Sequence, residues 1–180
     1  MNRNERIRAL INRLARLDAA QTWDGALNPA QRSALDYLGQ ANRFSRSPSH
    51  VAEYLGATRG TVSQTLKALS RKGFVSEERS ASDKRSISYQ LTDAGRQLAD
   101  AKSLLSAALV GRAEDELVLM ETALRGLLGA AVRANQSKPF GICHTCRYFK
   151  PQQSGGFCTL LQVALSSAET QQICHEHETA

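Results

Sequence analysis

The sequence predicts a mainly α-helical protein with a small β-wing, and three observations lead to this fold class. Apolar residues recur at helical spacing over most of the first 136 residues. Residues 47–91 combine two short helix patterns with an alternating strand pattern. All four cysteines lie in the last 38 of 180 residues. We therefore divide the chain into an N-terminal helix (1–27), a winged helix-turn-helix domain (28–91), further helices (92–136) and a four-cysteine extension (137–180).

The first two helices follow from apolar spacing and capping signals. Residues 3–20 place a stripe of apolar side chains on one face, which predicts an amphipathic helix. The stripe consists of Ile7, Leu10, Ile11, Leu14 and Leu17. Asn28 and Pro29 then supply an N-cap and a proline in the first helical position, and Gln31 can complete a capping box.

Residues 47–73 predict two short helices joined by a tight turn. Ser47 is an N-cap candidate, and Pro48 stands where a missing N–H has no cost. Gly56 is expected to end the first helix in the left-handed conformation. Thr58 opens the second helix and Gly73 closes it. The buried stripe of the second helix is Val62, Leu66 and Leu69.

The outward face of this second helix carries hydrogen-bonding groups and almost no carboxylates. Its members are Arg59, Thr61, Ser63, Gln64 and Lys67. Arginine can read guanine, glutamine can read adenine, serine and threonine can read either, and lysine neutralises phosphate. This composition is typical of a recognition helix in the major groove of double-stranded DNA.

A hairpin follows, with strands over residues 74–80 and 86–91 and a tip over residues 81–85. Ile87, Tyr89 and Leu91 alternate with polar residues, as in a strand buried on one face. A hairpin directly after a helix-turn-helix is a wing. We expect Lys84 and Arg85 at its tip to reach an adjacent groove or the DNA backbone.

The distribution of charge agrees with a DNA-binding surface. Residues 43–90 hold 9 basic and 4 acidic groups, a net charge of +5, whereas the whole chain has +6. The excess therefore coincides with the helix-turn-helix and wing, where phosphate would bind. Arg43 and Arg46 precede the motif and are further candidates for phosphate contacts.

At these residues the sequence resembles the MarR family of winged helix-turn-helix repressors. The matching stretches are NPAQRSALDYLGQA, HVAEYLGATRGTVSQTLKALSRKGFV and DKRSISYQLTDAGRQL. The resemblance is strong over residues 28–99. Residues beyond about 137 have no counterpart in a typical member of the family. The resemblance implies a homodimer in which the first helix joins the last two in the interface, and it is the sole basis for expecting repression.

Residues 92–136 read as helices rich in apolar side chains. Thr92 begins a long helical region in which Gly111 is a break, and residues 114–135 form another helix. We expect these helices to form a dimerisation layer that sets two recognition helices one DNA turn apart, about 34 Å. The operator should then be pseudo-palindromic.

The extension carries a cysteine pattern, C-x2-C-x11-C-x15-C, formed by Cys143, Cys146, Cys158 and Cys174. A C-x2-C turn brings two thiolates close together, and two further cysteines complete a four-thiolate set for a metal. Aromatic residues surround the cysteines, which favours an iron–sulfur cluster slightly over Zn2+. A metal-free thiol–disulfide switch remains open, and we leave His144, His175 and His177 out of the ligand set.

The favoured function is a cytoplasmic homodimeric transcriptional regulator whose DNA binding is modulated by this centre, through redox or iron sensing. We expect the tail to lie against the dimerisation helices. The alternative is a repressor that responds to a small aromatic ligand between the dimerisation layer and the wing domain, with a structural Zn2+ in the tail. A thiol redox enzyme using Cys143 and Cys146 is a distant alternative, because the βαβ context is missing. No apolar stretch is long enough for a membrane span.

Overall fold

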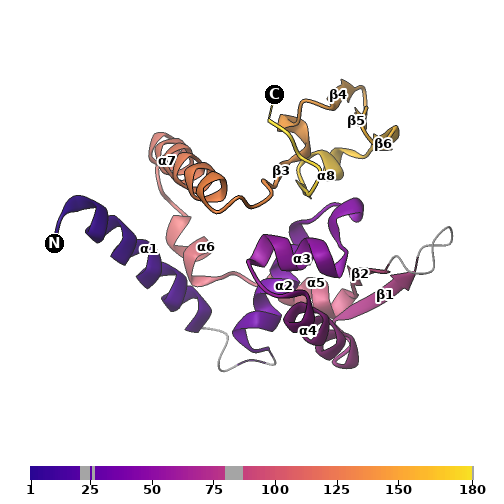
Figure 1. Ribbon diagram of the computed structural model, residues 1–180, viewed down its shortest axis with the longest axis horizontal. Helices are drawn as coiled ribbons and strands as arrows, with labels where there is room; N and C mark the ends of the chain where they lie inside the picture. The colour runs from indigo at the N-terminus through magenta and orange to yellow at the C-terminus, as the bar shows by residue number, and fades with distance from the viewer. Residues whose placement is uncertain (21–24, 26, 80–86, 180) are drawn as a thin grey trace.

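The computed structural model describes residues 1–20, 25, 27–79 and 87–179. Within them the chain is mainly helical, with antiparallel sheets of two, two and three strands, which confirms the predicted fold class. Helices α1, α6 and α7 lie on one side of the molecule, and the winged helix-turn-helix lies on the other (Figure 1). None of the described helices combines the length and the apolar character that crossing a membrane requires.

The first group of helices has an open apolar surface. α1 (Arg3–Ala20) contacts α6 (Leu104–Leu109), and the backbone N–H of Leu105 donates to Asp18 at 2.9 Å. α7 (Glu114–Ala134) follows at the predicted position. No residue of these three helices is buried in the single chain. Leu10 on α1 is 62% exposed and Leu119 on α7 is 72% exposed, so this surface lacks a partner within the described part of the protein.

The helical region after Thr92 differs from the expectation. It is divided into α5 (Asp93–Ala99) and α6, whereas the sequence predicted a continuous helix up to Gly111. The Ser103 hydroxyl accepts from the N–H of Ser106 at 3.1 Å and so starts a new helix. Gly111 does form the predicted break, with φ of 81°, before α7 begins.

α2 (Pro29–Gln40) begins with the predicted capping box. The N–H of Gln31 donates to Asn28 at 2.9 Å, and the Gln31 side chain accepts from the N–H of Asn28 at 3.3 Å. Its inner face supplies the centre of the core with buried Ala34, Leu35, Tyr37 and Leu38. A short 3-10 turn, η1 (Arg43–Ser45), then leads the chain into the helix-turn-helix.

The helix-turn-helix has the predicted bounds and caps. α3 (Pro48–Leu55) is capped by Ser47 and ends at Gly56, which has φ of 61°. α4 (Arg59–Arg71) is capped by Thr58, whose hydroxyl accepts from the N–H of Thr61 at 3.2 Å. Its inner stripe is buried in the core that α2 and α3 share, and consists of Val62, Leu66 and Leu69.

The wing consists of β1 (Val75–Arg79) and β2 (Ile87–Leu91). The strands pair antiparallel, from Val75 opposite Leu91 to Arg79 opposite Ile87. Tyr89 is buried, as the alternating pattern predicted. The wing tip, with Lys84 and Arg85, lies outside the described residues.

The cysteine extension folds into two small sheets. β3 (Gly141–Ile142) pairs with β7 (Ile173–Cys174), and β5 (Gly155–Cys158) lies between β4 (Phe149–Gln152) and β6 (Val163–Leu165). The turn η2 (Cys143–Thr145) and the short helix α8 (Ser167–Thr170) complete the fold of this segment.

The extension docks on the winged helix-turn-helix domain, which corrects the expectation that it lies against the helices over residues 92–136. Ala41 forms a parallel β-bridge with Ile173, and the N–H of Asn42 donates to the carbonyl of Ile173 at 2.9 Å. Phe140 packs edge-on against Tyr37 and Tyr54. Figure 1 shows the extension beside α3, away from α1. Apolar and backbone groups at the end of α2 thus hold the tail in place.

Candidate DNA-binding face and cysteine cluster

The outward face of α4 is arranged as the sequence predicted. Arg59, Thr61, Gln64 and Lys67 are exposed, and Ser63 is half-buried. The Thr61 hydroxyl lies 2.9 Å from the Thr58 hydroxyl, so it supports the helix start as well as facing solvent. The face therefore presents two cations and several neutral hydrogen-bonding groups on a rigid, capped helix.

Arg43 and Arg46 make internal contacts. Arg43 pairs with Glu169 and donates to the carbonyl of Ala164, both in the extension. Arg46 donates twice to the carbonyl of Ala41, at 2.8 and 2.9 Å. Burial lowers the pKa of the Arg46 guanidinium. Both side chains thus have a structural role, and their contact with phosphate stays a prediction, as does that of Lys84 and Arg85.

The structure brings Cys143 and Cys174 together in a small buried cluster. Both thiols are buried, and Cys158 packs against the same cluster with Leu165 and Phe149. A hydrogen bond between the first two thiols, together with burial, raises the pKa of Cys143. The same hydrogen bond lowers the pKa of Cys174 against the effect of burial. The hydrogen bond therefore shifts the pKa values of the two thiols in opposite directions.

Several donors point at the sulfur atoms. The Asn42 amide donates to Cys143 Sγ at 3.2 Å, and the backbone N–H of Glu178 lies 3.5 Å from Cys146 Sγ. Hydrogen bonds from Asn42, Glu176 and Ser45 contribute to the lowered pKa of Cys174. Such donors favour thiolates, the form that binds metals. All four cysteines are free, and the described residues contain no ready-made group of three or more His, Cys, Asp or Glu ligands.

The three histidines of the extension have other partners. His144 Nδ1 lies 3.2 Å from the carbonyl of Thr170, and His177 Nε2 lies 2.9 Å from the Thr145 hydroxyl. His175 Nε2 lies 2.9 Å from a carboxylate oxygen of Glu53 on α3. These hydrogen bonds do not test whether the histidines bind a metal, so their exclusion from the ligand set stays a prediction.

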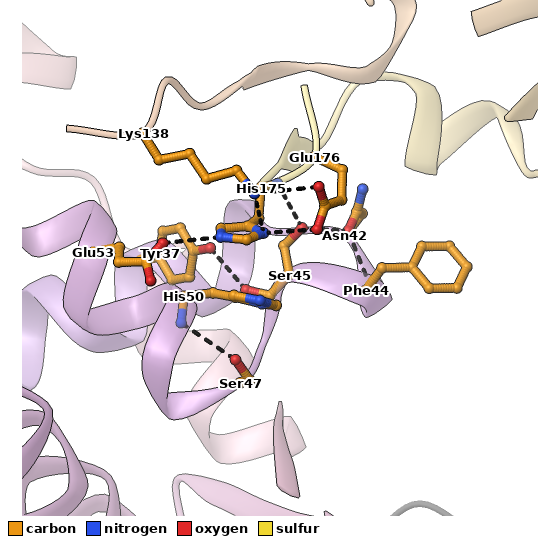
Figure 2. Close-up of polar contacts among 10 residues, drawn as sticks. All are labelled: Tyr37, Asn42, Phe44, Ser45, Ser47, His50, Glu53, Lys138, His175 and Glu176. Atoms are coloured by element: carbon orange, nitrogen blue, oxygen red, sulfur yellow. Dashed lines mark hydrogen bonds and ion pairs between the residues drawn. The ribbon is translucent and has the colours of Figure 1, made fainter. Parts of the chain in front are cut away.

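His175 anchors the extension on α3 (Figure 2). Its ring stacks on His50 with centroids 3.8 Å apart and meets Phe140 edge-on at 5.3 Å. Its Nδ1 lies within 3.3 Å of both Lys138 and Glu176. A single sequence contains no signal that pairs His50 with His175, a residue 125 positions away.

This stack predicts a pH-dependent stability. Burial, and then the nearby His175, lower the pKa of His50 to about 4, although Glu53 and Glu176 oppose the shift and Lys138 adds to it. The unfolded chain, with a pKa near the ordinary 6.5, takes up a proton first on acidification. The His50 contribution is therefore complete above about pH 6.5 and is lost as the pH falls towards 4.

Replacing His50 with Phe should flatten this pH dependence. Phenylalanine keeps the stacking surface but cannot take up a proton, and His50 Nδ1 is buried without a hydrogen-bond partner among the described residues. We expect the difference in Tm between pH 7 and pH 5 to be smaller in His50→Phe than in the wild type. An equal difference in both proteins would contradict the assignment.

A separate cavity of about 480 Å³ lies between α1, α2 and the α5–α6 segment. Its lining includes Ala15, Asp18, Arg32, Asp36, Leu98 and Leu105. Apolar walls with a few polar groups are typical of small-molecule sites, and the volume suits a small organic ligand. The cavity lies between the proposed dimerisation layer and the wing domain, where the alternative function predicts a small aromatic ligand.

Comparisons with known proteins agree with this fold. Residues 27–86 match the sequence profile of the MarR family. FabT of Streptococcus pneumoniae in complex with DNA is similar in structure, with 24% identity, a TM-score of 0.58 and coverage of 73% of this chain and 96% of FabT. A MepR–DNA complex of Staphylococcus aureus gives 20% identity, a TM-score of 0.56 and coverage of 73% and 99%.

BpsR of Bordetella bronchiseptica, whose DNA binding is regulated by 6-hydroxynicotinic acid, gives 20% identity and a TM-score of 0.53, with 70% of this chain and 92% of BpsR covered. At these identities the similarity establishes the fold. Each of the three structures leaves more than a quarter of this chain unmatched. No curated protein matches the sequence.

Proposed function

We propose that this chain is a MarR-type transcriptional regulator that binds double-stranded DNA through α4 and the wing. The observation that carries the proposal is the outward face of α4, which presents Arg59, Gln64 and Lys67 to solvent on a helix capped and buried on its other side. The match of residues 27–86 to the MarR family supports it, as do similar structures solved with DNA. We place the protein in the cytoplasm, and the sign of regulation as repression follows the family resemblance.

The protein would act as a homodimer. The apolar stripe of α1 and the side chains of Val118, Leu119, Leu124, Leu127 and Leu128 on α7 are exposed in the single chain. Exposed apolar surface of this extent marks an interface. A two-fold dimer through α1, α6 and α7 would set two α4 helices on successive major grooves of a pseudo-palindromic operator.

DNA selected by the wild-type protein from a randomised duplex library tests the α4 face. Replacing Arg59 with Ala should weaken binding to the selected sequence by about 10- to 100-fold, because a base-reading arginine contributes about 1–3 kcal/mol. Replacing Lys67 with Ala should make the slope of log K against log salt concentration shallower by about the contribution of one phosphate contact. Fluorescence anisotropy at several salt concentrations measures both effects.

Lys150→Ala is the matched control, because it removes an exposed cation from β4 in the extension. We expect it to bind the selected DNA like the wild type. Equal losses in Arg59→Ala and Lys150→Ala would show that overall charge, rather than the α4 face, determines binding.

We further propose that Cys143, Cys146, Cys158 and Cys174 hold a metal centre, an iron–sulfur cluster in preference to Zn2+, and that this centre modulates DNA binding. Support comes from the contact between two buried thiols, the third thiol in the same cluster and the N–H donors around them. The net charge of the site would change if a bound cluster were oxidised or lost iron. The protein's own groups shield the site and stabilise thiolates.

Metal analysis of protein purified without oxygen tests this part of the proposal. Iron and acid-labile sulfide with absorption near 400 nm would establish a cluster. One zinc ion per chain would instead make the tail a structural element. In that case the cavity beside Asp18 and Arg32 becomes the regulatory site, and a small aromatic ligand should release DNA at constant metal content.

A further inference from the structure

Two polar side chains of the DNA-binding domain are almost completely buried against the cysteine extension. Asn42 and Ser45 are each 1% exposed. Buried amides and hydroxyls require hydrogen-bond partners, and each of these two side chains has one partner in the extension. Asn42 Nδ2 donates to Cys143 Sγ at 3.2 Å. Ser45 Oγ accepts from the backbone N–H of His175 at 2.8 Å, as Figure 2 shows.

The orientation of the Asn42 amide is determined within η1. Its oxygen accepts from the backbone N–H of Phe44 at 3.1 Å and from the Ser45 hydroxyl at 2.8 Å. The oxygen is thus committed to two donors, and the NH2 group must face the sulfur. A donor directed at Cys143 favours its thiolate, which is the form that binds a metal.

The segment from Asn42 to Arg46, called the corner below, is also joined to the elements proposed to face DNA. Tyr37 donates from its hydroxyl to the carbonyl of Ser45 at 2.7 Å, and the carbonyl of Arg46 accepts from the N–H of Tyr89 on wing strand β2 at 3.0 Å. The next residue, Ser47, caps α3 through the N–H of His50. A displacement of η1 would therefore move the start of α3 and the base of the wing together.

We propose that Asn42 and Ser45 are positioning residues of the cysteine centre and transmit its state to the helix-turn-helix. When the cysteines bind a metal as thiolates, the hydrogen bond from Asn42 to Cys143 becomes stronger and holds η1 in place. Loss of the metal weakens this hydrogen bond and releases η1. This inference rests on the proposed metal centre and names the path by which that centre regulates DNA binding.

Zinc titration of the reduced, metal-free full-length protein against a competing chelator, with amide hydrogen exchange, tests the path. Asn42→Asp keeps the oxygen that caps η1 but replaces the sulfur-directed N–H with a carboxylate oxygen. Ser45→Ala removes the acceptor of the His175 N–H. We expect Zn2+ affinity to fall roughly 10- to 100-fold in Asn42→Asp. In the wild type, Zn2+ should slow exchange at residues 43–55, and in Ser45→Ala this slowing should be largely lost.

Glu169→Gln is the matched control, because Glu169 also joins the extension to the corner, through Arg43, but makes no contact with sulfur. Its Zn2+ affinity and exchange should match the wild type. Two results would overturn this inference but leave the proposed metal centre standing. One is wild-type Zn2+ affinity in both Asn42→Asp and Ser45→Ala, and the other is amide exchange at residues 43–55 that Zn2+ does not change. Failure of the wild type itself to bind Zn2+ would remove the metal centre, and the inference with it. If Asn42→Asp does not fold, Ser45→Ala still decides the result.

Discussion

Replacing Cys174 with Ser should prevent binding of the proposed metal and unfold the extension. Cys174 is buried, lies on a two-residue strand and shares a hydrogen bond with Cys143. A serine hydroxyl does not ionise near neutral pH and cannot replace the thiolate. The strands β3 and β7 pair over only two residues, so the proposed metal would add substantially to the stability of this segment; structural zinc in small domains contributes about 10–16 kcal/mol of binding free energy.

Metal content and limited proteolysis measure this effect. The Cys174→Ser protein should carry only background metal and should be cut within residues 137–180 at a protease concentration that leaves the wild type intact. Ala164→Ser is the control, since it introduces the same hydroxyl at an exposed position of β6. Full metal content and equal resistance in Cys174→Ser would contradict a role for this thiol.

Replacing Gly95 with Ala should destabilise the winged domain strongly. A Cβ at this position would lie 1.9 Å from the carbonyl oxygen of Phe74. That carbonyl cannot move freely, because it accepts from the N–H of Thr92 at 3.1 Å, and the Thr92 hydroxyl binds the carbonyl of Gly73 at 2.7 Å. We expect the free energy of unfolding to fall by about 3 kcal/mol, the upper part of the range for overpacking.

Urea denaturation in the absence of DNA gives this value. The control is Gly60→Ala on α4, where the added Cβ would meet only the Thr58 hydroxyl at 3.9 Å. Alanine is the better helix former, so the control should be neutral or slightly stabilising. A change below about 0.5 kcal/mol in Gly95→Ala, within the scatter of surface substitutions, would show that the contact between Gly95 and Phe74 can relax.

The local elements of the winged helix-turn-helix domain could be predicted because each is specified by neighbouring residues. Asn28, Ser47 and Thr58 cap the helices that follow them, and Gly56 adopts the left-handed conformation expected at a helix end. Periodicity identified the buried face of α4, and its complement is the exposed face proposed to contact DNA. The break before α6 was missed, because the cap at Ser103 competes with an apolar pattern that continues through it.

The position of the cysteine extension could not be predicted from the sequence. It depends on pairs separated by about 100 residues or more, such as Asn42 with Cys143 and Glu53 with His175. Spacing predicts that the four cysteines act together, and this stays a prediction, but periodicity contains no signal for the surface on which a loop-rich segment docks. The expectation of contact with the dimerisation helices was based on chain order, and it was wrong for that reason.

The central claim is that a cysteine-ligated metal centre controls DNA binding. The most direct test compares the affinity for the selected DNA with and without the metal. Protein purified without oxygen is measured by fluorescence anisotropy before and after removal of its metal, at one salt concentration. We expect at least a tenfold difference in Kd, with sequence-specific binding in the tighter state. Equal affinity in the two states would leave the metal a structural role only, and the absence of sequence-specific binding in both would contradict the proposed function.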